Sequence, residues 1–116
     1  MSSTVFFILV FLQLKHWYVD FVLQTDAQVK GKGIYGNIDG LKHSLQHGVF
    51  TTLVFSQFSA HYLIIGLVDF VLHYHIDWIK VNYGNQDITC KKFWVDLGAD
   101  QTMHQLCYLI YILVII

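Results

Sequence analysis

Apolar residues gather in four long segments of the chain, which are separated by two polar stretches and one short link. Apolar runs of about 20 residues favour helices, because strands rarely exceed about eight residues. At ~1.5 Å per residue such a helix spans about 30 Å, the thickness of the hydrocarbon core of a bilayer. The pattern therefore predicts an all-α fold, a four-transmembrane-helix bundle that forms a single integral membrane domain over residues 1–116. The predicted helices cover residues 4–24, 41–58, 61–80 and 93–116.

The polar stretches, residues 25–40 and 81–92, are predicted to be loops, and their lysines indicate an orientation. Four alternating spans place both loops on one side of the membrane, and the positive-inside bias places that side in the cytoplasm. We therefore expect a multi-pass protein of the inner (cytoplasmic) membrane with both termini outward. Its first segment lacks the basic region and cleavage site of a signal peptide, so we expect the mature protein to retain it. Six of the seven lysines lie in or beside the loops: Lys30, Lys32, Lys42, Lys80, Lys91 and Lys92.

The composition fits this membrane interpretation and excludes several function classes. Hydrophobic residues make up 55% of the chain and charged residues 13%, about half the roughly 25% charged residues of ordinary soluble domains. A soluble helical protein is the alternative, but 116 residues are too few to bury four such helices in water. A net charge of −1 argues against a nucleic-acid-binding module, and two cysteines cannot build a disulfide framework.

Each predicted helix carries two ionisable residues four positions apart. This spacing puts both side chains on one helix face, one turn apart. Under the predicted topology all eight residues lie in the cytoplasmic half of the bundle, within about two turns of one level. The pairs are His16 with Asp20, His43 with His47, His73 with Asp77, and Asp100 with His104.

Metal coordination is the chemistry that imidazole and carboxylate groups share, and facing helices of a bundle can build a metal site from such pairs. We expect the eight paired residues to hold a divalent metal ion, with zinc or manganese favoured. The histidines 16, 47, 73 and 104 are the preferred ligands, and Asp20, Asp77 and Asp100 are expected to act as ligands or catalytic general bases. The expected supporting residues are Gln24, Gln101, His75 and Asp69, whereas Lys15 is expected to snorkel or to form an ion pair.

At these motifs the chain resembles a family of small, uncharacterised multi-pass membrane proteins of bacteria and their phages, catalogued as a domain of unknown function. The resemblance covers nearly the whole chain and implies a helical inner-membrane protein, but it brings no established activity. It is carried by H-x-x-x-D-F-x-x-Q (16–24), VKGKG (29–33), H-S-L-Q-H (43–47), H-Y-H-I-D-W-I-K (73–80) and D-Q-T-M-H (100–104).

More distantly, the chain resembles membrane-bound proteins labelled metal-dependent hydrolases, which are also built on intramembrane His/Asp pairs. The chain departs from the family pattern in His61 and His75. The choice of ligands on the third predicted helix, which contains both of these extra histidines, therefore stays open.

Three functions are compatible with these residues. The leading hypothesis is a metal-dependent hydrolase that acts at the cytoplasmic membrane face on a lipid or lipid-linked phosphate. The second is a protein that binds or transports protons or metal ions through the same side chains. The third is a non-catalytic membrane interaction protein whose polar pairs hold the bundle together. The expected partners are the bilayer, a lipid substrate or a membrane partner protein, and a second copy of the chain in a homo-oligomer, but no nucleic acid.

Overall fold

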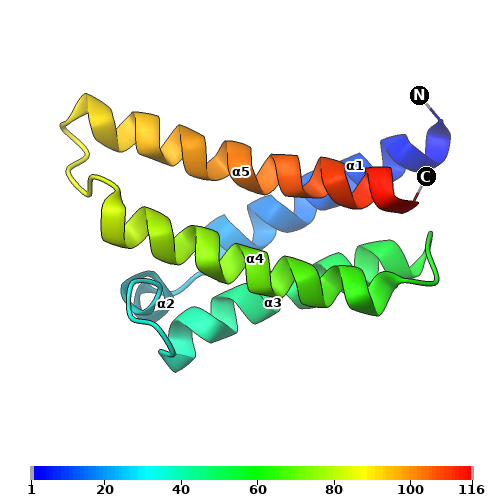
Figure 1. The fold of residues 1–116 in the computed structure, drawn as a ribbon, viewed down its shortest axis with the longest axis horizontal. Coiled ribbons are helices and arrows are strands. Elements are labelled where there is room, and N and C mark those ends of the chain that lie inside the picture. Colours follow the sequence, from blue (N-terminus) through cyan, green and yellow to red (C-terminus); the bar gives the residue numbers. More distant parts are fainter. Residues whose placement is uncertain (1, 116) are drawn as a thin grey trace.

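The computed structural model describes residues 2–115, and within that range it contains helices, turns and no strand. Long helical segments run lengthwise, with the termini and the α3–α4 link at one end and α2 and the α4–α5 link at the other (Figure 1). The predicted all-α fold is confirmed, while residue 116, the end of the fourth predicted helix, lies outside the described residues. The elements are α1 (Ser3–Trp17), η1 (Tyr18–Leu23), α2 (Asp26–Gly31), α3 (Ile38–Ser56), α4 (Tyr62–Tyr83) and α5 (Lys91–Ile115).

The prediction of one uninterrupted loop over residues 25–40 is wrong, because this stretch contains the short helix α2. Thr25 begins it with a capping box: its hydroxyl accepts from the Gln28 backbone N–H at 3.2 Å, and its own N–H donates to Gln28 Oε1 at 3.1 Å. The two contacts satisfy backbone donors that a helix start otherwise leaves free. The Thr-x-x-Gln signature is readable in the sequence and indicates this helix.

The first predicted helix is also not α-helical throughout. Its last six residues, Tyr18–Leu23, form the π-helix η1, in which each turn holds more residues than an α-turn. This π-helix carries Asp20, and the chain leaves it at Gln24 in an extended conformation. Short π-helical segments occur frequently at functional sites, so its position next to the predicted ligands is notable.

Helices α3 and α4 approach closely where two glycines face each other. A Cβ atom on Gly66 would lie 2.9 Å from the backbone oxygen of Gly48, and a Cβ atom on Gly48 would lie 2.9 Å from the oxygen of Gly66. Real Cβ atoms do not tolerate such distances, so only glycine allows this crossing. Small residues commonly bring helix backbones together in this way inside membranes.

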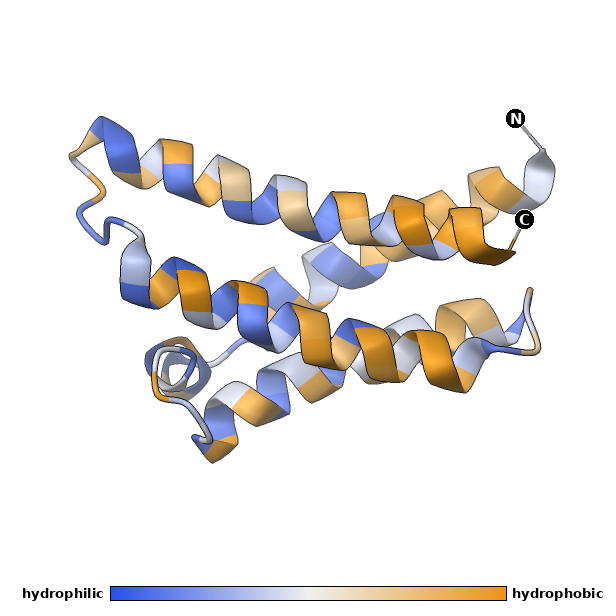
Figure 2. Ribbon diagram, viewed as in Figure 1, coloured by the Kyte–Doolittle hydropathy of each residue, from blue (hydrophilic) through white to orange (hydrophobic). Residues whose placement is uncertain are grey.

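The distribution of polar and apolar residues is inverted relative to a soluble domain. Among the described residues, the buried polar or charged side chains outnumber the buried hydrophobic ones, twelve to nine. The buried apolar cluster lies toward the end with the termini, where α1, α3, α4 and α5 contribute Ile8, Phe55, Ile65 and Tyr111 among others. Large hydrophobic residues instead cover the outer surfaces of the long helices, whose apolar stretches are orange in Figure 2.

Two helical segments in the described part of the chain are long and apolar enough to cross a membrane. One combines α1 and η1 over Ser3–Leu23, and the other is α4, Tyr62–Tyr83. Helices α3 and α5 are not among them, and both carry several of the polar residues described below. The structure therefore gives weak support to membrane association and supports two of the four predicted spans.

Candidate metal centre

Polar stripes on η1 and the long helices meet in the interior of the bundle. Each stripe continues the four-residue spacing of the predicted pairs, so its side chains lie on one helix face. All of these side chains are buried except that of Asp20, which is 11% exposed. The stripes are His16 and Asp20; His43, His47 and Thr51; Asp69, His73 and Asp77; and Asp100, His104 and Tyr108.

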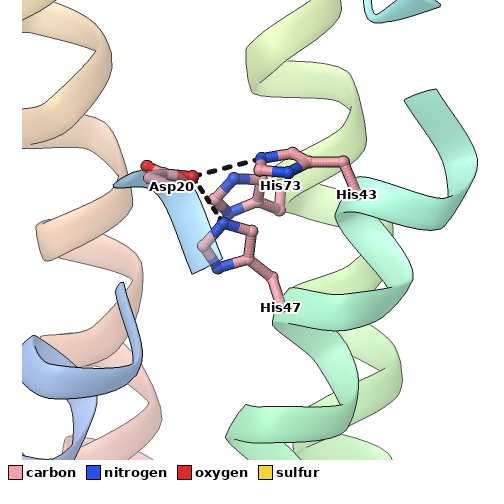
Figure 3. Close-up of side chains that lie close together, drawn as sticks. All are labelled: Asp20, His43, His47 and His73. Atoms are coloured by element: carbon pink, nitrogen blue, oxygen red, sulfur yellow. Dashed lines mark hydrogen bonds and ion pairs between the residues drawn. The ribbon is translucent and has the colours of Figure 1, made fainter. Parts of the chain in front are cut away.

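The first group of candidate ligands is Asp20, His43, His47 and His73, whose potential ligand atoms all lie within 4.8 Å of one another. The side chains come from η1, α3 and α4 and point toward one another (Figure 3). His47 Nε2 donates to Asp20 Oδ1 at 2.7 Å, and His43 Nε2 lies 3.1 Å from the same oxygen. Three imidazoles and one carboxylate are a donor set that suits a zinc or manganese ion.

The second group is His73, Asp77 and His104, so the two groups share His73. Asp77 Oδ2 lies 3.3 Å from His73 Nε2, and Asp77 Oδ1 lies 3.2 Å from His104 Nε2. The His73 ring is stacked between two other imidazoles, with ring centroids 3.6 Å from His47 and 3.8 Å from His104. The cluster is therefore continuous from η1 to α5.

Several buried atoms of the cluster have no hydrogen-bond partner. Both ring nitrogens of His43 and of His73 are in this state, as is Oδ2 of Asp77. His43 Nε2 and His73 Nε2 each lie within ion-pair distance of a carboxylate oxygen, but neither makes a hydrogen bond to it. Buried polar atoms are normally satisfied, because an unpaired one costs about 1–3 kcal/mol. Free lone pairs that converge in one place are what an ion would occupy, so the residues fit a divalent metal.

Two of the eight predicted ligands, His16 and Asp100, lie at the edge of the cluster and belong to neither group. His16 Nε2 is 3.1 Å from Asp20 Oδ2 and 2.6 Å from Gln101 Oε1, and its Nδ1 is 2.8 Å from the Tyr108 hydroxyl. Asp100 Oδ1 lies 3.4 Å from His104 Nε2, and Gln101 donates to its Oδ2 at 3.0 Å. Gln101 and Tyr108 of α5 thus contact His16 of α1, and Asp100 contacts the second group through His104.

The four predicted supporting residues occupy different positions. Gln101 connects His16 with Asp100, as just described, while Gln24 donates to the backbone oxygen of Asp20 at 3.0 Å and so holds the end of η1. His75 lies outside the cluster: its Nδ1 donates to the oxygen of Val71 at 2.7 Å, and its Nε2 is 3.0 Å from the Tyr35 hydroxyl. Of the two histidines within α4, His73 belongs to the candidate ligand groups and His75 does not.

Asp69 is the centre of a second buried network, one helical turn before His73 on α4. Its carboxylate accepts from Lys15 Nζ at 3.2 Å, from Thr51 Oγ1 at 2.6 Å and from the Tyr111 hydroxyl at 2.9 Å. The Lys15 amine also lies 3.0 Å from His47 Nδ1, so it links this network to the candidate ligands. The expectation that Lys15 forms an ion pair is confirmed, and its partner is Asp69.

Four features of the site were not predicted from the sequence: the buried positions of Thr51, Tyr108 and Tyr111, and the inward position of Lys32. Lys32 follows α2 and reaches Asp77 Oδ2 at 3.6 Å, so a residue expected only to mark the cytoplasmic side also touches the cluster. Thr51 and Tyr108 were detectable, because each lies four residues beyond a predicted histidine and continues its stripe. The contact of Lys32 depends on the fold of residues 25–40, and no local pattern indicates it.

No curated protein and no solved structure matches the chain. A family model described as "Protein of unknown function (DUF3307)" matches residues 8–116, a range that contains every side chain of the cluster. The description assigns no activity, so the function has to be argued from the site itself. Because the match takes in nearly the whole sequence, the chain belongs to the DUF3307 family.

Proposed function

We propose that the chain is a multi-pass protein of the inner membrane, with four spans formed by α1 with η1, α3, α4 and α5. The inverted distribution of residues supports this, because large apolar side chains exposed on every long helix would be unstable in water but not in lipid. The lysines of α2 and of the turn after it, and those of α4 and α5 next to the α4–α5 link, belong to segments at one end of the molecule (Figure 1). The positive-inside bias places that end in the cytoplasm and both termini outward.

We further propose that the cluster is the centre of a metal-dependent hydrolase at the cytoplasmic face, acting on a lipid or lipid-linked phosphate. The observation that carries the proposal is the convergence of two ligand groups on His73, whose ring nitrogens are both buried and unpartnered. Asp20, His43, His47 and His73 would hold one ion, and His73, Asp77 and His104 form the alternative or second position. Buried ionisable groups are costly in a membrane and mark functional sites there.

The chain's own residues supply the groups that hydrolysis needs. A bound divalent ion would acidify a water molecule and polarise a phosphoryl oxygen. Asp77 Oδ2 has no hydrogen-bond partner and would serve as the general base for such a water. The Lys32 amine, 3.6 Å from the same oxygen, supplies a positive charge for a phosphate. The contact of Lys32, which directly follows α2, with the cluster supports a reaction at the level of the lipid headgroups.

Elemental analysis of the purified protein in detergent tests the metal centre. We expect about one ion per chain, and we expect His73→Ala and the more conservative His73→Gln to lose most of it. His75→Ala is the matched control, since His75 is a histidine on the same helix whose partners lie outside the cluster. A folded wild-type protein without metal, or a His73→Gln variant with the full amount, would contradict the proposal. Helix content measured by circular dichroism establishes that each variant is folded.

Release of inorganic phosphate from a lipid phosphate in mixed micelles tests the reaction. Activity should disappear on chelation, return when zinc or manganese is added back, and be lost in Asp77→Asn. Asp87→Asn is the control, because Asp87 is an exposed carboxylate of the α4–α5 link. Full activity in Asp77→Asn would remove Asp77 from the mechanism.

A proton relay is the second candidate function, and one contact favours it. A Lys15 ammonium that donates to His47 Nδ1 leaves the imidazole proton on Nε2, where it donates to Asp20 Oδ1. Lys15, His47 and Asp20 then form a continuous hydrogen-bonded chain in which His47 Nε2 is not free to bind an ion. Proton flux in proteoliposomes, lost in His47→Ala and kept in His75→Ala, would support this function. Flux equal to that of empty liposomes would count against it.

A further inference from the structure

A cleft separates α4 from α5 at the end that carries the α4–α5 link. It has a volume of about 290 Å³, at the lower end of the range for ligand pockets. Its walls are mainly apolar and include Ile76 and Ile79 from α4 and Met103 from α5. Asp100 also lines it, so the cleft reaches from the outer surface of the bundle to the edge of the His/Asp cluster.

The inner end of the cleft has an unsatisfied acceptor. Asp100 is 6% exposed, and its Oδ1 is buried: His104 Nε2 lies 3.4 Å away, within ion-pair distance, but makes no hydrogen bond to it. An acceptor in that state is stabilised by a molecule that brings an N–H or O–H group, because a buried carboxylate oxygen without a donor is costly. Asp96 does not compete for this role, since its Oδ2 already accepts from Lys92 Nζ at 2.7 Å and from the Asn85 N–H at 2.8 Å.

The outer end of the cleft presents a positive charge. Lys80 belongs to the lining and lies in the last turn of α4, which faces the lipid headgroups in the proposed topology. Its side chain makes no ion pair within the described residues, so its ammonium is available to an anion. An apolar wall, a free ammonium at the rim and an unpartnered carboxylate oxygen inside are together complementary to a phospholipid.

We propose that the α4–α5 cleft binds a phospholipid whose headgroup joins a phosphate to a hydrogen-bond donor. The acyl chain lies along Ile76, Ile79 and Met103, the phosphate meets Lys80, and an ammonium or hydroxyl of the headgroup donates to Asp100 Oδ1. This inference rests on the proposed membrane location and names the substrate class and the lateral entrance of the proposed hydrolase. It does not require that the cluster hold a metal.

Lipid retention tests the proposal. The protein is purified from mixed micelles that contain equal amounts of phosphatidylethanolamine, phosphatidylglycerol and phosphatidylcholine, and the lipids that remain bound are measured by native mass spectrometry. Phosphatidylcholine has the phosphate but no N–H or O–H donor, so we expect it to be retained at least about fivefold less than the better of the other two. Preference for phosphatidylethanolamine identifies an ammonium donor, and preference for phosphatidylglycerol a hydroxyl. Equal retention of all three would overturn the proposal.

A variant that fills the cleft provides the second arm. Met103→Trp should reduce the retained lipid several-fold, whereas Leu106→Trp should not. Leu106 is the matched control, because it lies on the same helix, is 46% exposed against 49% for Met103, and does not line the cleft. Equal retention in the two variants would overturn the assignment of the cleft.

Metal content measured in the same samples separates the two proposals. Selective lipid retention without metal would leave the lipid site standing and remove the metal centre. Bound metal with equal retention of all three lipids would support the metal centre and overturn the lipid site. Met103→Trp and Leu106→Trp should both keep the wild-type metal content, since neither residue belongs to a candidate ligand group.

Discussion

At the scale of single residues, the buried pair of Lys15 and Asp69 is the contact with the largest expected effect on stability. Both side chains are 3% exposed, and each charge is compensated chiefly by the other. Removing one partner of such a pair leaves an uncompensated buried charge, which costs about 3–5 kcal/mol. We therefore predict that Asp69→Ala lowers the free energy of unfolding by about this amount, measured by denaturant unfolding in detergent micelles.

Replacing both partners provides the control for this prediction. In the double variant Lys15→Met, Asp69→Leu no charge remains unpaired, and similar apolar replacements are often neutral or stabilising. We expect it to recover most of the stability lost in Asp69→Ala, apart from the hydrogen bonds of Thr51 and Tyr111. A double variant as unstable as Asp69→Ala would show that the ion pair is not the cause.

The four pairs of histidine and aspartate residues, three His/Asp and one His/His, could be predicted from the sequence, because a spacing of four residues determines which side chains share a helix face. Their contacts across the bundle could not. Asp77 meets His73 on its own helix, His104 on α5 and Lys32 after α2, and no local pattern predicts the last two. The division into two groups that share His73 likewise depends on how the helices are rotated about their axes.

At the scale of elements, the crossing of α3 and α4 depends on Gly66. A methyl group there would contact the Thr52 hydroxyl and the backbone of Gly48, and the backbone cannot move without separating the helices. We predict that Gly66→Ala destabilises the protein by about 1–3 kcal/mol, the usual cost of overpacking. The loss of stability is measured by thermal unfolding in detergent, with circular dichroism as the readout.

Gly98 of α5 is the matched control for Gly66. A Cβ atom at Gly98 would meet nothing within 4 Å, so a methyl group there fits. Gly98→Ala should be neutral or stabilise the protein by about 0.5–1 kcal/mol through the higher helix propensity of alanine. If Gly66→Ala and Gly98→Ala had the same thermal stability, the close approach of α3 and α4 would not contribute to the stability of the protein.

The four long helices follow from the length of the apolar runs, and the observed bounds lie within a few residues of the predicted ones. Two features did not follow from that pattern. The π-helix η1 differs from an α-helix by its wider turns, and the apolar run over Tyr18–Leu23 is compatible with both. Helix α2 is only six residues long, too short for a periodic pattern, and only its capping box indicates it.

At the scale of the whole molecule, the proposed topology makes a prediction about sidedness. The link between α2 and α3 and the link between α4 and α5 should face the cytoplasm, and the link between α3 and α4 the opposite side. Single cysteines introduced as Tyr35→Cys, Ile88→Cys and Ala60→Cys, all at exposed positions, report on the three links once Cys90 and Cys107 are replaced by serine.

A membrane-impermeant maleimide should label the cysteine at position 60 in intact cells, and those at positions 35 and 88 only after permeabilisation. Labelling of positions 35 and 88 from opposite sides would contradict four spans. If positions 35 and 88 were labelled in intact cells and position 60 only after permeabilisation, the protein would have four spans in the opposite orientation.

The single imidazole shared by the two ligand groups has a consequence for stoichiometry. A neutral imidazole has one free lone pair, so His73 can coordinate only one ion at a time. When both positions are occupied, one of the two ions therefore lacks the His73 ligand. The two positions would then bind metal with negative cooperativity. The second ion would bind more weakly than the first by the free energy of the missing coordination bond. A titration with metal would show one tight step followed by a weak one, and the weak position would be the natural point at which the phosphate of a substrate completes the coordination.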